Sequence, residues 1–132
     1  ASEQKKETLE YRDYVQEMQV ETAKDGYRFT FVIADIAGYK GENSIRQTLY
    51  HVQADSLEMA AELYRIENER QLDFGHMKQI AADMTGQEIH PLLLELGQRS
   101  GISKSIPVMM ETDGAKYILR EMIKAAYGRE SL

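Results

Sequence analysis

One short segment, GYKGEN at residues 38–43, brings a phenol, an amine and an amide close together and contains two glycines. Glycine loops that bind phosphate join a strand to a helix, whose first N–H groups point at the anion. Here the next segment has the pattern of a strand, and neither common phosphate-loop spacing is matched. We therefore predict a hairpin connection that exposes Tyr39, Lys40 and Asn43 as candidate binding residues.

Other residue types capable of chemistry are scattered along the chain. His51, His76 and His90 are far apart and show no metal-ligand spacing. Cysteine is absent and no serine lies in a G-x-S-x-G turn, so nucleophilic catalysis has no support. Glu111 follows a predicted strand and is a candidate for ligand or partner binding. We predict no metal and no cofactor, and the sequence leaves open whether the chain is an enzyme.

Cations alternate with tyrosines along the predicted hairpins. Such interleaving suits stacking on single-stranded nucleic acid, and GYKG also matches the bare G-x-x-G of some RNA-binding loops. However, 16 Lys+Arg against 22 Asp+Glu give a net charge of −6, which opposes binding to polyanions. Nucleic acid is thus the third choice of partner, through Lys24, Arg28, Lys40 and Arg46 with Tyr27, Tyr39 and Tyr50.

Three consecutive leucines, residues 92–94, lie in a predicted short helix over residues 92–96. A single helix rarely buries three adjacent side chains in one core. Leu92 and Leu93 are therefore candidates for an oligomer or partner interface. The alternative is a helix that is buried on all sides.

Length and composition indicate one ordinary globular domain. The chain has 132 residues, 42% hydrophobic and 29% charged, enough to bury a core. Residues 1–13 are predicted to form a polar tail or a short helix, and residues 14–132 a single α+β domain. No apolar run is long enough to cross a bilayer, and the start does not resemble a secretion signal. We expect a cytoplasmic protein that does not bind membranes.

The predicted strands precede most of the helices. Alternation predicts strands at 18–22, 27–33 and 45–53, with an Asp-Gly turn between the first two. A fourth strand is predicted at 106–110. Two helices are predicted to follow aspartate caps, one from Asp55 to residue 71 and one from Asp73 to residue 86. A short helix is predicted over 92–96, after Pro91, and a last helix over 114–127, with its cap at Thr112 or Asp113. The fold class is therefore α+β, a mostly antiparallel sheet of a three-strand meander plus a later strand, with helices on one face.

Three functions follow, in order of preference. The first is a small regulator, inhibitor or accessory subunit that binds another protein or itself, through the hairpin face or the 92–96 helix. The second is a small-molecule enzyme or sensor, with a pocket between subunits of a homo-oligomer lined by Tyr39, Lys40, Tyr50 and Glu111. The third is nucleic-acid binding, in which Lys40 and Arg46 would contact phosphate.

Overall fold

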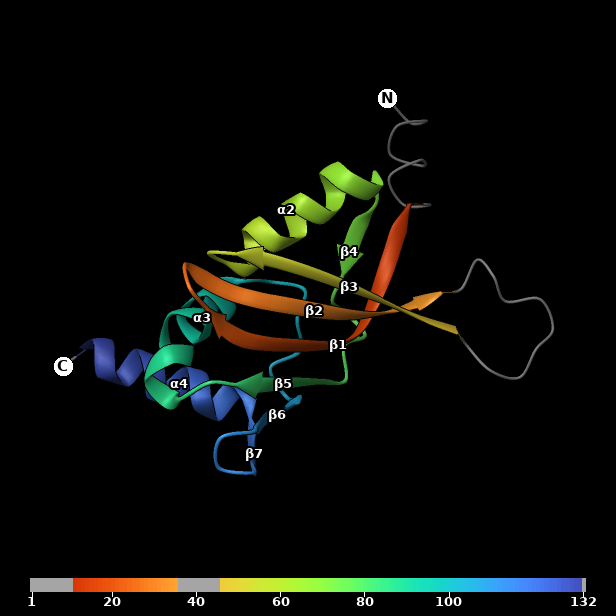
Figure 1. Ribbon diagram of the computed structural model, residues 1–132. Coiled ribbons are helices and arrows are strands. Elements are labelled where there is room, and N and C mark those ends of the chain that lie inside the picture. Colours follow the sequence, from red (N-terminus) through yellow and green to blue (C-terminus); the bar gives the residue numbers. More distant parts are fainter. Residues whose placement is uncertain (1–10, 36–45, 132) are drawn as a thin grey trace.

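The computed structural model describes residues 11–35 and 46–131, and in them one mixed sheet carries three helices (Figure 1). The strand order is β3-β2-β1-β5-β6-β7, and β4 pairs with β1 beside β5. The α+β class is confirmed, but the sheet has seven strands and is not purely antiparallel. Its elements are β1 (Arg12–Ala23), β2 (Gly26–Asp35), β3 (Arg46–Ala54), α2 (Leu57–Asn68), β4 (Gln71–Asp73), β5 (Gln79–Asp83), α3 (Gly86–Gln98), β6 (Pro107–Met110), β7 (Ala115–Ile118) and α4 (Leu119–Ser131).

The first strand is longer than its alternating pattern predicts. The pairing of β1 with β2 shifts between Val15 and Glu17, which marks a β-bulge at Gln16. This extra residue turns both Val15 and Met18 toward the core, where each is 0% exposed. Their spacing of three resembles a helical face, which explains why the sequence also suggested a short helix there.

The two antiparallel hairpins of the meander are confirmed within the described residues. Lys24 and Asp25 form the tip of the first hairpin, and Gly26 follows with a φ of 132°, a value that favours glycine. β2 alternates as predicted, since Phe29, Phe31 and Ile33 are all buried. β3 pairs with β2 without interruption from Arg46 to Ala54.

The helix predicted from Asp73 to Gly86 is wrong. Residues 71–73 and 79–83 form β4 and β5, which both pair in parallel with β1. A turn joins them, in which the Asp73 carboxylate accepts a hydrogen bond from the Gly75 N–H rather than capping a helix. Phe74, Met77, Ile80 and Met84 are buried, but their helix-like spacing spans two strands and a turn.

Both helix starts near the core depend on side-chain caps. Ser56, not the predicted Asp55, caps α2 by accepting from the Met59 N–H. Thr85 and Glu88 form a capping box at α3, which corrects the predicted start at Pro91. Pro91 lies inside α3 on its exposed side, where water can satisfy the carbonyl that loses its partner.

The C-terminal prediction combined a strand and a helix into one element. Residues 115–118 form β7, antiparallel to β6, and α4 begins only at Leu119. Asp113 does not cap a helix; its carboxylate accepts from the Ala115 N–H in the β6–β7 turn. The Thr112 hydroxyl instead donates to the Met84 carbonyl. α4 also continues past Gly128, which was expected to end it.

One hydrophobic cluster joins a single face of the sheet to all three helices. It contains the inward residues of β1, β2, β5 and β6 together with those of α2, α3 and α4. The placement of helices on one face is therefore confirmed in the described part of the chain. Consequently no helix within residues 11–35 and 46–131 covers the opposite face of the sheet.

Candidate functional site

The helix-free side of the sheet, which we call the open sheet face, is the candidate functional site. Its side chains are those that alternate with the core residues on the neighbouring strands, and most are exposed or half-buried. It holds two shallow hollows: the amide-lined hollow, which contains four glutamines, and the acid-lined hollow, which contains three acids. The open sheet face comprises Glu17, Gln19, Glu21, Arg28, Thr30, Val32, Leu49, His51, Gln79, Ala81 and Asp83, with Gln16, Gln47, Lys78 and Glu111 at its margins.

The amide-lined hollow is held in place by side-chain hydrogen bonds within β1 and between strands. The Glu17 carboxylate accepts from the Gln19 amide at 2.7 Å and from the Gln79 amide at 2.5 Å. The Gln47 amide donates to the Gln16 side-chain oxygen at 2.7 Å, so the bulge on β1 reaches β3. These bonds leave several amide donors and acceptors directed at solvent, a surface suited to a polar partner.

The acid-lined hollow carries both paired and unpaired charge. Arg28 donates to Glu21 at 2.5 Å across the β1–β2 hairpin, and Thr30 Oγ1 lies 2.9 Å from His51 Nδ1. Asp83 and Glu111 line the same hollow. Among the residues that the structure describes, neither of these two carboxylates takes a hydrogen bond or an ion pair. This end of the face therefore attracts cations.

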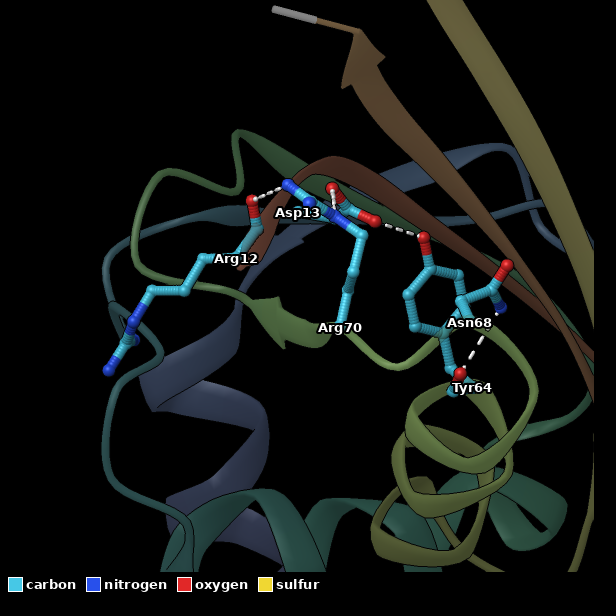
Figure 2. A network of polar contacts seen from close by, with 5 residues as sticks. All are labelled: Arg12, Asp13, Tyr64, Asn68 and Arg70. Carbon is cyan, nitrogen blue, oxygen red and sulfur yellow. Dashed lines mark hydrogen bonds and ion pairs between the residues drawn. The ribbon is translucent and has the colours of Figure 1, made fainter. Parts of the chain in front are cut away.

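A second polar cluster lies on the helix side, where β1 begins (Figure 2). Asp13 accepts from the Tyr64 hydroxyl on α2 and from Arg70 Nε at 2.6 Å. Arg70 also donates to the Arg12 carbonyl at 3.0 Å, while Arg12 pairs with Asp73 at 3.1 Å. Each side chain of this Asp13 cluster makes at least one polar contact within the chain, although the buried Nε of Arg12 has no hydrogen-bond partner among the described residues. We therefore assign it to the attachment of α2 and β4 to β1.

Two tyrosines of the helix side have displaced acidities. Burial and the hydrogen bond to Glu67 raise the pKa of Tyr50 to about 12. Burial, and next the bond to Asp13, raise the pKa of Tyr64 still further. The two rings contact each other edge to face with centroids 4.7 Å apart. Both phenols are consequently neutral packing groups at neutral pH, unsuited to act as bases.

The predicted site residues do not gather in one place. Tyr39, Lys40 and Asn43 lie outside the described residues. Glu111 lies on the open sheet face, and Arg46 is exposed at the start of β3. Tyr50 points the other way, toward α2, so it does not share a pocket with Glu111.

The leucine interface needs a correction. Leu92 and Leu93 are only 1% and 2% exposed, and both belong to the core cluster. A helix that lies between the sheet and α4 can bury adjacent residues, because it has neighbours on more than one side. The alternative of a helix buried on all sides is not met either, because α3 keeps an exposed side that carries Gln87 and Pro91.

The interleaved cations and tyrosines separate onto different sides of the sheet. Tyr27 is buried, and its hydroxyl donates to the Glu88 carbonyl of α3 at 3.2 Å. Arg28 lies on the open sheet face, paired with an acid. No stacking platform with adjacent cations forms from these residues in the part of the chain described.

Sequence reasoning missed Asp83, Gln19 and Gln79, which help to line the hollows. Gln79 and Asp83 were placed in a predicted helix, so their alternation with apolar residues was not recognised as a strand pattern. A strand at 79–83 would have revealed them, since Ile80 and Ala82 alternate with polar neighbours.

Comparison with known proteins gives one result. Residues 5–125 match the model of the spore germination protein N-terminal domain. The chain belongs to this family. No curated protein and no solved structure matches it.

For this germination domain, two further findings bear on function. Within residues 11–35 and 46–131 there is no group of three or more His, Asp or Glu side chains placed to hold a metal ion. Nor does any helix in these ranges have the length and apolar character needed to cross a bilayer. The predicted cytoplasmic location remains a prediction.

Proposed function

We propose that this germination domain is a non-catalytic, protein-binding subunit that acts in a complex during spore germination. Its open sheet face would be the surface that contacts the partner. This proposal refines the regulator or accessory subunit expected from the sequence, and the family match agrees with it in outline.

The observation that carries the proposal is the unpaired acid pair on a face that lacks a helical cover. Asp83 and Glu111 lie in one hollow, and the neighbouring Glu21 is already neutralised by Arg28. A partner with lysine or arginine side chains would complete the charges at this end. Toward β3, the amide-lined hollow offers hydrogen bonds that would set the register of that partner.

The test is charge reversal on the open sheet face. We expect Asp83→Lys with Glu111→Lys to weaken partner binding by about tenfold or more, since each lost ion pair at an interface contributes on the order of 1 kcal/mol. Spores whose germination protein carries both changes should germinate more slowly, measured by the fall in optical density. The level of the protein should stay normal, because both side chains are exposed.

The matched control reverses two exposed acids on helices, Glu62→Lys with Glu121→Lys. It makes the same change in net charge away from the open sheet face. A photo-crosslinking residue at Ala81, compared with one at Lys124 on α4, would identify the contacting protein. Equal germination rates for the two charge-reversal variants, or crosslinks from Lys124 alone, would contradict the proposal.

A further inference from the structure

We infer that the outer edge of β3 is a self-association site, at which a second copy of this chain adds its own β3 in antiparallel orientation. This surface is distinct from the acid pair and does not depend on the proposed function. Figure 1 shows β3 (yellow) at the border of the sheet, with α2 nearby.

The edge is long and regular. β3 runs from Arg46 to Ala54 and, among described residues, pairs only with β2. Alternate residues of such a strand point their backbone N–H and C=O groups away from the sheet. The β2–β3 pairing shows no bulge along these nine residues, so the outer edge is a continuous ladder of backbone groups that no other described strand pairs with.

β3 also lacks the features by which edge strands usually avoid pairing. It contains no proline and no lysine, and between Arg46 and Ala54 it has no arginine, aspartate or glutamate. Leu49 is 56% exposed near its centre. The opposite edge of the sheet differs, because β7 has only four residues and includes the exposed Lys116.

An apolar stripe on α2 lies beside this edge. Met59 and Ile66 are 48% and 63% exposed, and Leu63 between them is half-buried. At about 100° per residue these three side chains fall within an arc of about 60°, next to Glu67. Glu67 accepts a hydrogen bond from Tyr50 at 2.6 Å, which places the stripe on the β3 side of the helix. A strand added to β3 would therefore cover the stripe with its inward side chains.

Charge identifies the occupant as a second copy. Arg46 lies at one end of β3, and Asp55 follows its other end; both are exposed. Antiparallel pairing centred on Tyr50 sets each Arg46 opposite Ala54 and therefore one residue from the Asp55 of the other copy, twice in one twofold interface. Parallel pairing would place like charges together. The edge is thus self-complementary in one orientation only.

The experiment is a charge swap followed by its reversal. Wild-type chain should show a concentration-dependent mass rising from 15.1 kDa toward twice that value in sedimentation equilibrium. Arg46→Asp and Asp55→Arg should each weaken dimerisation by about tenfold or more, because each creates two like-charge contacts. The double variant Arg46→Asp/Asp55→Arg should restore it, since the pairs re-form with their signs exchanged.

Controls separate this site from other contacts. Lys116→Asp, on the other edge, should leave the dimer unchanged, and circular dichroism should show that every variant is folded. Asp83→Lys with Glu111→Lys should also dimerise normally, so the two proposals can fail separately. A wild-type chain that stays monomeric at all concentrations overturns the inference, even if a different protein binds β3. A dimer that is insensitive to the single swaps overturns it as well.

Discussion

The bond between Tyr64 and Asp13 allows a quantitative test of how α2 is held against β1. Tyr64 is 6% exposed, and its hydroxyl donates to an Asp13 carboxylate that also binds Arg70 (Figure 2). Tyr64→Phe removes one hydrogen bond but leaves Asp13 paired with Arg70. We therefore expect a loss of about 1 kcal/mol in the free energy of unfolding.

Asp13→Ala should lower the free energy of unfolding by more than Tyr64→Phe does. It leaves two hydrogen-bond donors without their acceptor, whereas Tyr64→Phe removes one donor. The buried phenol loses its acceptor, which costs about 1–3 kcal/mol. Arg70 loses a partner too, but its side chain is 34% exposed and can be hydrated, so this adds less than about 1 kcal/mol. The expected total for Asp13→Ala is about 2–3 kcal/mol.

The double variant Tyr64→Phe/Asp13→Ala has no phenol that lacks an acceptor, so the two losses in unfolding free energy should not add. We expect a coupling free energy of about 1–2 kcal/mol from a double-mutant cycle. Guanidinium denaturation at pH 7, followed by circular dichroism, gives each value, and an unchanged m-value confirms that the folded state is comparable. Glu21→Ala, which breaks the exposed pair with Arg28, is the control and should cost less than about 1 kcal/mol. Additive losses, or an Asp13→Ala cost no larger than that of Tyr64→Phe, would refute this reasoning.

Three other predictions follow from the helix side of the sheet. Because the pKa of Tyr50 is raised from 10.0 to about 12, stability should be lost as pH rises from 10 to about 12, and denaturation at a series of pH values should show a smaller loss for Tyr50→Phe. Glu95→Ala removes a carboxylate that accepts two N–H groups of the first turn of α2, at 2.9 and 2.8 Å, and should lower the unfolding free energy by about 1–2 kcal/mol in urea. A Cβ at Gly97 would lie 2.5 Å from the Tyr127 ring of α4, so Gly97→Ala should lower the melting temperature despite its better helix propensity; Gly86→Ala, which has open space, should raise or preserve it.

The sequence predicted best where one period holds without interruption. β2 places Phe29, Phe31 and Ile33 on one face, so this strand and its core face were found, and β3 was found as its hairpin partner. The face of β3 was predicted wrongly, because Tyr50 was expected beside Thr30 but points toward α2. β1 was only partly found, because the bulge at Gln16 replaces a two-residue period by a three-residue spacing. For residues 73–84, two short strands and a turn happened to imitate a helical stripe, and no local property distinguishes the two.

The sequence could not predict which side chains are neighbours on the open sheet face, and the reason is a different one. Asp83 comes close to Arg28 and Glu111 only because β5 pairs with β1 on one side and with β6 on the other. Each of these parallel contacts needs a long crossover, which passes through β2, β3, α2 and β4 between β1 and β5 and through α3 between β5 and β6. The hydrophobic pattern does not specify the resulting order of strands. The family match identifies the domain but does not supply that order.

If both proposed surfaces operate together, their geometry sets a condition on the partner. β5 lies three strand positions from β3, about 14 Å, and Asp83 is level with Gln53, about 10 Å from the centre of β3 at Tyr50. In the antiparallel pair the two acid ends would therefore be roughly 40 Å apart on one continuous face. A single basic side chain would neutralise one end only. A partner that is itself twofold, or one that carries two basic segments roughly 40 Å apart, would engage both ends and gain affinity through the effective concentration of the second contact. Arg46→Asp should then weaken the binding of such a partner although Asp83 and Glu111 are unchanged. A partner with one basic segment should bind this variant as it binds the wild type.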